Sequence, residues 1–396
     1  MLMAAVMERP TAEARARSGV TRIAHVDVLH DMHEAEPVWR ALEAEVLTPY
    51  QRFDFLAQWQ EQVGTREGLQ PCIVIARDAD RQPLMLLPLA AGQENGVRVA
   101  RFMGGKHVTF NMPLLRRDFA AAATPDDLEA LLDGLRNKPV NIDVLAFARQ
   151  PERWRDLTNP MALLPSQTAV NDCPLMTITP GATPAERISN SFRRRLKGKE
   201  RKLQALPGYR YHLLDSDADI QRTLDWFFVV KPQRMAAQKL PNVFADPGVE
   251  EFLRAACMTR LPNGTRAIKI HSIECDSEII AIFAGVADNS RFSMMFNTYT
   301  MSESARYSPG LILMRDIIDH YAEHGYTSLD LGIGSDDYKR LFCKSDEPIF
   351  DSFLALTAIG KLAAIGMSSL THAKRMVKHT PALMQLAQML RGALHR

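Results

Sequence analysis

The sequence lacks most of the features that mark specialised protein classes. Its 396 residues include only 5 cysteines, and none are spaced as C-x-x-C, which argues against a zinc ribbon or a disulfide framework and favours a reducing cytoplasm. No run of 18 apolar residues occurs, so no membrane-spanning helix is expected. P-loop, nucleophile-elbow and metal-binding patterns are also missing, so kinase, hydrolase and metal-dependent functions have no support.

The charge balance excludes another class. The net charge is only +2, so bulk charge gives no reason to expect DNA as a partner, although a local basic site remains open. The composition, 46% hydrophobic and 24% charged with 21 Gly and 23 Pro, is typical of a globular protein of two or three domains. Residues 1–20 are expected to be a disordered leader, and no basic segment precedes their apolar start as it would in a signal peptide.

The order of predicted elements occurs twice along the chain. Residues 21–60 show helical patterns, and an α/β unit follows in each half. In the first half we expect strands at 72–77, 84–91 and 97–103, a helix after Thr124-Pro125 and a strand at 140–147. In the second half we expect strands at 267–275, 279–287 and 292–299, a helix from Ser308-Pro309 to Gly325 and a strand at 328–331. One α/β unit used twice explains this order, and two unrelated halves that share it by chance are the alternative.

Prolines and glycine at 174–184 mark a boundary between the halves, which predicts domains at 21–178 and 179–356. Beyond them, residues 357–396 contain no acidic residue and form a basic amphipathic helical pattern that breaks at Pro381. Such a tail can pack its apolar stripe on its own domain and expose a basic face. It can equally lie on an anionic membrane surface or dock on a partner such as an envelope-synthesis complex.

Several short motifs in order resemble one enzyme family. In the second half these are Tyr307–Leu313, Gly325-Tyr326, Leu329–Gly334 and Tyr338–Phe342, and in the first half Phe55–Trp59, Leu86–Leu89 and Phe102–Gly105, with the basic Ser191–Leu196 between them. Together, over residues 40–345, they resemble the cellulose-biosynthesis-type (CelD/BcsL) branch of the GNAT acyltransferases. The same tandem architecture is similar to the Fem-type peptidoglycan aminoacyltransferases, which draw on aminoacyl-tRNA.

The resemblance implies an α/β fold of two tandem GNAT-like domains, with mixed, mostly antiparallel sheets flanked by helices. It also implies transfer of an acyl group, usually acetyl from acetyl-CoA, to a sugar or polysaccharide precursor without a metal. Such an enzyme would be cytoplasmic or peripheral on the inner membrane face.

A donor thioester needs a site for its phosphates, and the N-terminus of a helix favours anions. Ser308, Pro309 and Gly310 open such a helix, and Arg306 adds a charge nearby. The family turn reads Gln/Arg-x-x-Gly-x-Gly/Ala, whereas here the first Gly comes one place late and the second is missing. A plain Ser N-cap followed by Pro is the structural alternative. Gly332 and Gly334 follow a strand, where they allow close approach of a ligand or form a tight turn.

Acyl transfer also needs proton carriers. Asp330, in the strand that precedes those glycines, is a candidate general base or a structural acid. Tyr338 could protonate the leaving thiolate, and Lys339 could hold a phosphate or an acceptor carboxylate, or else both are ordinary helix residues. His107, after Gly104-Gly105, could act as a base across the cleft between the halves, although a lone histidine is often structural.

Candidate acceptor-binding residues come from three places. Asn297 and Tyr299 share one face of a strand. They could contact a ligand in one cleft, or they could form a cross-strand polar pair. Arg234 ends an aromatic and basic segment. Seven positive charges, Arg194 and Arg195 among them, lie within residues 193–202, and could bind a pyrophosphate-linked sugar, an RNA acceptor stem or anionic lipid, or simply be solvated.

Three hypotheses follow. The first is an acyltransferase that holds its donor in the second half and a sugar nucleotide, lipid-linked sugar or exopolysaccharide unit between the halves. The second is a Fem-type aminoacyltransferase. The third is a non-catalytic effector of polysaccharide synthesis that binds a nucleotide signal.

Overall fold

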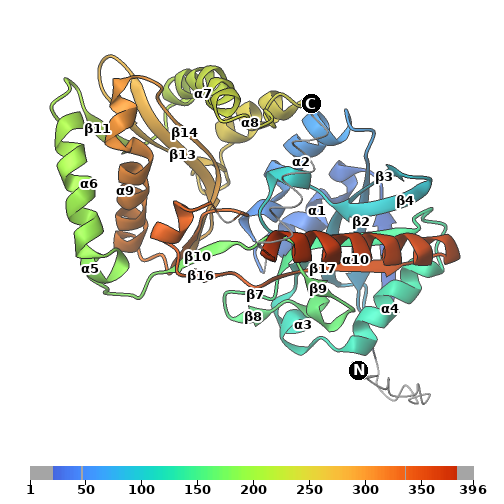
Figure 1. Ribbon diagram of the computed structural model, residues 1–396. Helices are drawn as coiled ribbons and strands as arrows, with labels where there is room; N and C mark the ends of the chain where they lie inside the picture. Colours follow the sequence, from blue (N-terminus) through green and yellow to red (C-terminus); the bar gives the residue numbers. More distant parts are fainter. Residues whose placement is uncertain (1–20, 46–47, 335, 381–396) are drawn as a thin grey trace, which may run out of the picture.

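The computed structural model describes residues 21–45, 48–334 and 336–380, which form two α/β halves side by side, each built around its own sheet (Figure 1). The predicted leader at 1–20 and the end of the predicted tail at 381–396 lie outside the described residues.

The first sheet has eight strands in the spatial order β1-β2-β3-β4-β6-β17-β9, with β5 paired to β3. Its strands are β1 (His25–Leu29), β2 (Gln70–Arg77), β3 (Pro83–Glu94), β4 (Val97–Phe102), β5 (Leu114–Leu115), β6 (Val144–Pro151), β9 (Gln167–Thr168) and β17 (Ile349–Ala355). A separate two-stranded ribbon is formed by β7 (Arg153–Trp154) and β8 (Leu157–Thr158).

The second sheet has seven strands in the order β11-β12-β13-β14-β15-β10-β16. They are β10 (Pro174–Thr177), β11 (Arg210–Leu213), β12 (Lys269–Glu274), β13 (Ile279–Ala287), β14 (Arg291–Tyr299), β15 (Ser328–Asp330) and β16 (Ser345–Asp346).

Each sheet is antiparallel apart from one parallel pair, β4 with β6 in the first and β14 with β15 in the second. A helix connects the members of each pair, α4 (Pro125–Arg136) in the first half and α9 (Pro309–Glu323) in the second. The predicted order of strands and helix is therefore confirmed in both halves, as is the mixed α/β fold with mostly antiparallel sheets flanked by helices.

The remaining helices are α1 (Met32–Glu43), α2 (Phe53–Trp59), α3 (Arg117–Ala122), α5 (Pro184–Arg187), α6 (Asn190–Leu203), α7 (Asp217–Ala237), α8 (Val249–Met258) and α10 (Ala358–His379). The mixed helical pattern expected at 21–60 did not include a strand, whereas residues 25–29 form β1. This short strand lies at the sheet edge, pairing antiparallel with β2.

Two strands lie in the sheet of the other half. β17 follows the second half in sequence but lies between β6 and β9 of the first sheet, and β10 precedes that half but pairs with β15 and β16 of the second sheet. Strand membership therefore differs from the predicted ranges 21–178 and 179–356. The ranges themselves stay a prediction about folding units, because strand pairing does not show which segment folds independently.

The halves share one hydrophobic core. α6 and α9 cover one face of the second sheet, while α7 and α8 lie on its other face, toward the first half (Figure 1). There Phe252 of α8 packs edge-on against Phe55 of α2, with ring centroids 5.3 Å apart. A single cluster of buried side chains continues from the first sheet through these rings into β13 and β14. This packing fixes how the two halves face each other.

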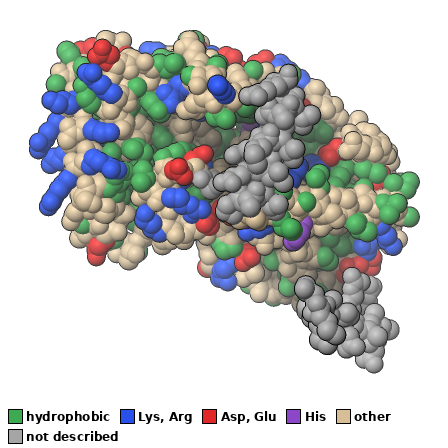
Figure 2. Space-filling model, viewed as in Figure 1, with side chains coloured by type: hydrophobic (Ala, Val, Ile, Leu, Met, Phe, Trp, Pro, Cys, Tyr) green, Lys and Arg blue, Asp and Glu red, His purple; other side chains and the backbone are tan. Residues whose placement is uncertain are grey.

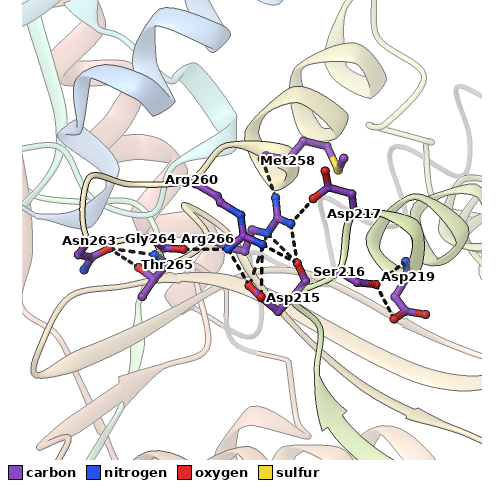
Figure 3. A network of polar contacts seen from close by, with 10 residues as sticks. All are labelled: Asp215, Ser216, Asp217, Asp219, Met258, Arg260, Asn263, Gly264, Thr265 and Arg266. Atoms are coloured by element: carbon purple, nitrogen blue, oxygen red, sulfur yellow. Dashed lines mark hydrogen bonds and ion pairs between the residues drawn. The ribbon is translucent and has the colours of Figure 1, made fainter.

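The start of α7 is anchored by a buried arginine (Figure 3). Arg266 is 4% exposed and donates to the Asp215 carbonyl (3.1 Å), to the last carbonyl of α8 at Met258 (2.7 Å), and to Asp217. Ser216 caps α7 by accepting from the Asp219 N–H (3.1 Å). α7 is thus held rigidly at the end remote from its basic residues Lys231 and Arg234. In the described residues no helix is both long and apolar enough to cross a membrane.

We predict that Phe252→Ala destabilises both halves together. Removing a buried phenyl ring costs about 3–5 kcal/mol, and Phe252 belongs to the core that both halves share. Thermal unfolding followed by calorimetry should show one transition at a lower temperature. Phe228→Ala, which truncates a half-buried ring on the same helical pair, should cost less. Two separate transitions, of which only one moves, would contradict the shared core.

Candidate active site

The candidate site begins where the two parallel strands of the second sheet diverge. β14 and β15 pair only from Arg291–Ser328 to Ser293–Asp330. Beyond that point β15 ends, while β14 continues to Tyr299. The edge of β14 that faces β15 is therefore open from residue 294 onward. Crevices at the carboxyl ends of diverging parallel strands are common ligand sites in α/β proteins.

The backbone is shaped for close approach at this point. A β-bulge leaves Met295 unpaired, because Phe296 pairs with Ala284 and Met294 with Gly285. Gly332 has a φ of 71°, in the left-handed region, and a Cβ there would lie 3.1 Å from the Met294 carbonyl oxygen. The loop after β15 can pass this close to β14 only because residue 332 is glycine.

Four predicted residues meet along the open edge. The Asn297 side-chain amide lies 3.5 Å from the Tyr338 hydroxyl. The Arg234 guanidinium stacks 3.3 Å above the Tyr299 ring, a cation–π arrangement. The structure therefore brings Asn297, Tyr299, Arg234 and Tyr338 to one side of β14. Burial raises the pKa of Tyr338, so its phenol stays protonated at neutral pH.

Sequence reasoning missed Lys231, which lies on the same edge. Its ammonium donates to the Asn297 carbonyl (2.9 Å) and lies 5.7 Å from the Phe244 ring centroid. Burial, with a smaller effect of Arg234, lowers the pKa of Lys231 to about 8. The i, i+3 spacing of Lys231 and Arg234 places both on one face of α7, and this spacing was the available signal.

The N-terminus of α9 lies beside the end of β14. The backbone of Ser308 is in the left-handed region (φ 57°, ψ 50°). Ser308 is the N-cap residue and Pro309 follows it, as in the structural alternative, but the side chain of Ser308 makes no capping hydrogen bond. Instead the Ser308 hydroxyl accepts from the ammonium of Lys199 on α6 (2.7 Å). A Cβ at Gly310 would lie 3.6 Å from the Tyr299 ring. A lysine beside the positive end of a helix dipole creates a strongly anion-attracting position. Pro309 begins the helix here, whereas Arg306 is exposed and pairs with Glu303 (3.5 Å).

A cavity of about 270 Å³ lies between the halves, next to this edge. Its lining comes from the β4–β5 connection and β6 of the first sheet, from the α7–α8 loop and α8, and from β14 and the segment after β15. The lining residues are Lys106, His107, Val108, Thr109, Arg149, Val243, Phe244, Leu253, Met294, Met295, Phe296, Leu331, Gly332, Ile333 and Lys339. The structure thus brings the predicted His107 and Lys339, from opposite halves, to one cavity. No Asp or Glu is among its lining residues.

His107 is uncharged in this cavity. Its ring packs against Phe252 (5.9 Å between centroids), and its Nε2 is buried with no hydrogen-bond partner in the described part of the chain. Burial, with repulsion from Lys106, lowers the pKa of His107 to about 4. A neutral imidazole with an unpartnered nitrogen can accept a hydrogen bond or a proton from a bound molecule.

Lys339 is 3% exposed and is engaged within the protein. Its ammonium donates to the carbonyls of Gly332 (3.2 Å) and Ile333 (3.0 Å) and lies 3.6 Å from Asp336. A Cβ at Gly334 would lie 3.7 Å from that ammonium. Burial lowers the pKa of Lys339. Lys339 therefore fixes the loop that carries the two predicted glycines.

Asp330 lies beneath the cavity and does not line it. The carboxyl is fully buried and accepts hydrogen bonds from the Ser293 hydroxyl and from the Gly332 N–H (3.2 Å). Burial raises the pKa of Asp330 to about 6. Its bonds join β14, β15 and the following loop, which is the geometry of a structural acid.

Arg194 and Arg195 lie on the exposed side of α6, away from the cavity. Figure 2 shows the resulting basic patch at the left of the molecule, where Figure 1 draws α6. Arg195 lies over the Phe192 ring (4.8 Å), and no ion pair restrains either arginine among the described residues. Within those residues no group of three or more His, Cys, Asp or Glu side chains is placed to hold a metal ion.

Comparisons with known proteins agree with this architecture. Residues 190–340 match the family described as acetyltransferase (GNAT) domain. No curated protein matches the sequence. The second half therefore carries a GNAT-type acyltransferase domain, and the chain is an enzyme of the transferase class. The finer resemblance to the CelD/BcsL branch stays a prediction.

Solved structures share the fold across both halves. One is the C-terminal domain of a candidate lysylphosphatidylglycerol synthetase from Agrobacterium fabrum (10% identity, TM-score 0.51, covering 86% of this chain and 98% of that chain). Another is FemX, with 9% identity and a TM-score of 0.52, covering 81% of this chain and 99% of that chain. A third is a conserved protein of unknown function from Bacteroides thetaiotaomicron, with 10% identity and a TM-score of 0.52, covering 84% of this chain and 100% of that chain. At such low identity these likenesses show the fold alone.

We predict that His107→Gln flattens the fall in stability at acid pH. The folded-state pKa of about 4 is below the unfolded value near 6.5, so the unfolded chain binds more protons between these values. Stability is therefore fully present above about pH 6.5 and is lost as pH falls toward about 4. The free energy of unfolding, measured with urea at about pH 7.5 and about pH 5, should fall less between these pH values in the variant than in the unmodified protein.

The exposed ring of His372 on α10 is solvated in both states, so His372→Gln is the matched control for that comparison. Equal losses in the unmodified protein and in His107→Gln would show that His107 is protonated as easily in the folded protein as in the unfolded chain.

Proposed function

We propose that the protein transfers an acyl group from an acyl-CoA thioester, with acetyl-CoA the first candidate, to a hydroxyl or amine of an anionic sugar or cell-envelope precursor. The observation that supports this most is the continuity of two features. The open edge of β14 lies next to the start of α9 at Tyr299, and Met294, Met295 and Phe296 of the same strand line the cavity between the halves. A donor and an acceptor can therefore meet at one place.

The donor fits the second half. Pro309 has no N–H group, and the N–H groups of Leu311 and Ile312 donate to the Ser308 carbonyl. The Gly310 N–H group and the ammonium of Lys199 would therefore hold the phosphates of the donor. The open edge of β14 offers backbone groups to a ligand that carries amides, in the way that a strand edge binds an added strand. Coenzyme A supplies an acyl group activated as a thioester. Gly310 would let the donor pass close to Tyr299.

The acceptor fits the cavity. Arg149 brings positive charge to its wall, whereas Lys106 is paired with Asp246. Apolar side chains such as Phe244, Leu253 and Met295 form much of the rest. A molecule with an anionic group and a less polar body satisfies both parts, as a phosphate-linked sugar does. At about 270 Å³ the cavity is at the small end of ligand sites, so it suits the reacting portion of a larger precursor.

Two side chains would move the protons. His107, held neutral by burial, would take the proton of the acceptor hydroxyl or amine as its oxygen or nitrogen attacks the thioester carbon. The new C–O or C–N bond forms, the C–S bond breaks, and Tyr338 would protonate the departing thiolate. Lys339 and Asp330 are positioning residues in this scheme, because they hold the loop at Gly332.

A second candidate function is transfer of an aminoacyl group from an RNA. The specific observation in its favour is the exposed basic face of α6, whose charges extend from Lys199 beside the start of α9. Phosphate backbones bind such clusters without base contacts.

We predict that Gly310→Trp abolishes acetyl-CoA binding, whereas Gly310→Ala preserves it. A methyl group at residue 310 meets only ordinary contacts, but an indole would fill the space between α9 and Tyr299. Calorimetric titration of both variants, with their melting temperatures as a folding check, measures this.

We predict that Lys199→Met weakens acetyl-CoA binding about tenfold, because it removes one charge-assisted contact. Lys197→Met on the exposed side of α6 is its matched control in the same titration.

If folded, unmodified protein does not bind acetyl-CoA, the donor assignment is wrong. Salt-sensitive tRNA binding that Arg194→Gln with Arg195→Gln abolishes would then establish the second candidate.

We also predict that Tyr338→Phe lowers kcat by about 10²-fold and leaves the Kd for the donor nearly unchanged. The variant loses the proton donor to the thiolate but keeps the ring that packs beside Asn297. Rates should recover with an acyl thioester whose leaving thiol is more acidic, because that thiolate needs no proton. An equal loss with both thioesters would assign Tyr338 a positioning role.

A further inference from the structure

α10 is seated firmly on the first sheet by one of its faces. Gly360 and Ala364 are buried against β6 and β17, next to Val97 and Val144. Gly360 lies so close to the chain that a Cβ would come within 2.0 Å of the Asp143 carbonyl oxygen. At the other end of α10, Arg375 donates to the Ala169 carbonyl and Lys378 to Asn171 (2.6 Å). The helix is therefore part of the folded body.

The opposite face of α10 is apolar and exposed to solvent. Its large side chains are 51–76% exposed, namely Ile359, Leu362, Ile365, Leu370 and Met376. At 3.6 residues per turn they fall within an arc of about 140°. Small residues fill the gaps, so no charged side chain interrupts the arc. Figure 1 draws α10 across the front of the first sheet, and hydrophobic side chains lie at the surface in that region of Figure 2. We call these five residues the α10 stripe.

The charges that α10 itself carries have one sign, and the nearest acids of other segments, Asp143 and Asp172, lie at its two ends. No acidic residue occurs between residues 352 and 380. Lys361 and Lys374 are exposed and lie at the two borders of the arc. The other two basic residues of the helix, Arg375 and Lys378, turn inward to the protein. An apolar arc with a lysine on each border matches an anionic bilayer surface, where apolar side chains enter the acyl boundary and lysines reach the headgroups.

We propose that the α10 stripe binds the surface of an anionic phospholipid membrane, with α10 lying flat on it. The helix has 22 residues and so offers a contact about 33 Å long. A second copy of the chain is a poorer occupant, because two stripes packed together would gather four border lysines with no acid from either helix to neutralise them. This inference is independent of the donor and acceptor assignments, and would hold the enzyme beside envelope precursors.

The test is co-sedimentation of the full chain with phospholipid vesicles. We expect binding to vesicles with about one third phosphatidylglycerol, weakened by salt, and much weaker binding to phosphatidylcholine alone. Leu362→Ser with Ile365→Ser should lower the partition at least about tenfold. Val229→Ser with Leu240→Ser removes two comparably exposed apolar side chains elsewhere and should change nothing.

Charge is tested separately with Lys361→Gln and Lys374→Gln together. The partition should fall about tenfold on anionic vesicles and remain unchanged on neutral ones. A chain that ends at residue 380 keeps the α10 stripe and should still bind.

Three results would overturn the proposal. They are no binding of the intact protein at low salt, binding that survives in Leu362→Ser with Ile365→Ser, or binding lost in the chain that ends at 380. Dimerisation that this double variant abolishes, without vesicle binding, would instead assign the α10 stripe to a second copy.

Discussion

The divergence of two parallel strands is the constraint on which the candidate site depends. Asp330 holds it open, because one buried carboxyl accepts hydrogen bonds from Ser293 at the last paired position of β14 and from the N–H of Gly332 just beyond β15. Past this clamp the strands separate and β14 presents an open edge. A buried carboxyl is costly without partners, and its raised pKa reflects that cost, but its hydrogen bonds join the elements around the opening.

The second requirement is a rigid relation between the halves. β17 and β10 cross into the sheets of the other half, and the Phe55–Phe252 contact belongs to one continuous core. The cavity has walls from both halves, so its shape depends on this packing. His107 lines the same cavity as Gly332 and Lys339 because this packing fixes the first half against the second. Proteins that share this fold at low identity over most of their length show that the arrangement tolerates very different sequences.

Electrostatics distinguish the parts of the site. The start of α9 combines a helix dipole with Lys199, while the cavity wall carries Lys106 and Arg149 but no acid. Lys106 is paired with Asp246, so in the cavity wall the positive charge available to an anionic acceptor is that of Arg149, whose guanidinium donates to backbone carbonyls. Burial lowers the pKa of both His107 and Lys231. The shift brings the pKa of Lys231 close to neutral pH, whereas it keeps His107 unprotonated there.

Local patterns in the sequence determined the elements of each half, because hydrophobic period, turn residues and the glycine after α9 act over a few positions. The strands β12–β14, the helix from Pro309 and the neighbouring placement of Asn297 and Tyr299 followed from such patterns. The order of motifs also pointed to the GNAT fold. Local patterns favoured packing of the tail on its own domain and left membrane or partner docking as the alternative. In α10 one face packs on the first sheet and the opposite face is exposed.

Only the tertiary structure decided which residues meet. The Lys199–Ser308 bond spans 109 positions, and His107 shares a cavity with a residue more than two hundred positions later. Asp330 became a structural clamp and not a cavity acid because of which side chains the second sheet places around it. The sequence did not reveal the exchange of β10 and β17 either, because the sheet that a strand joins depends on the partner strands that the folded core places beside it. Spacing along a chain fixes neighbours on one element, whereas contacts between elements depend on how every other element packs.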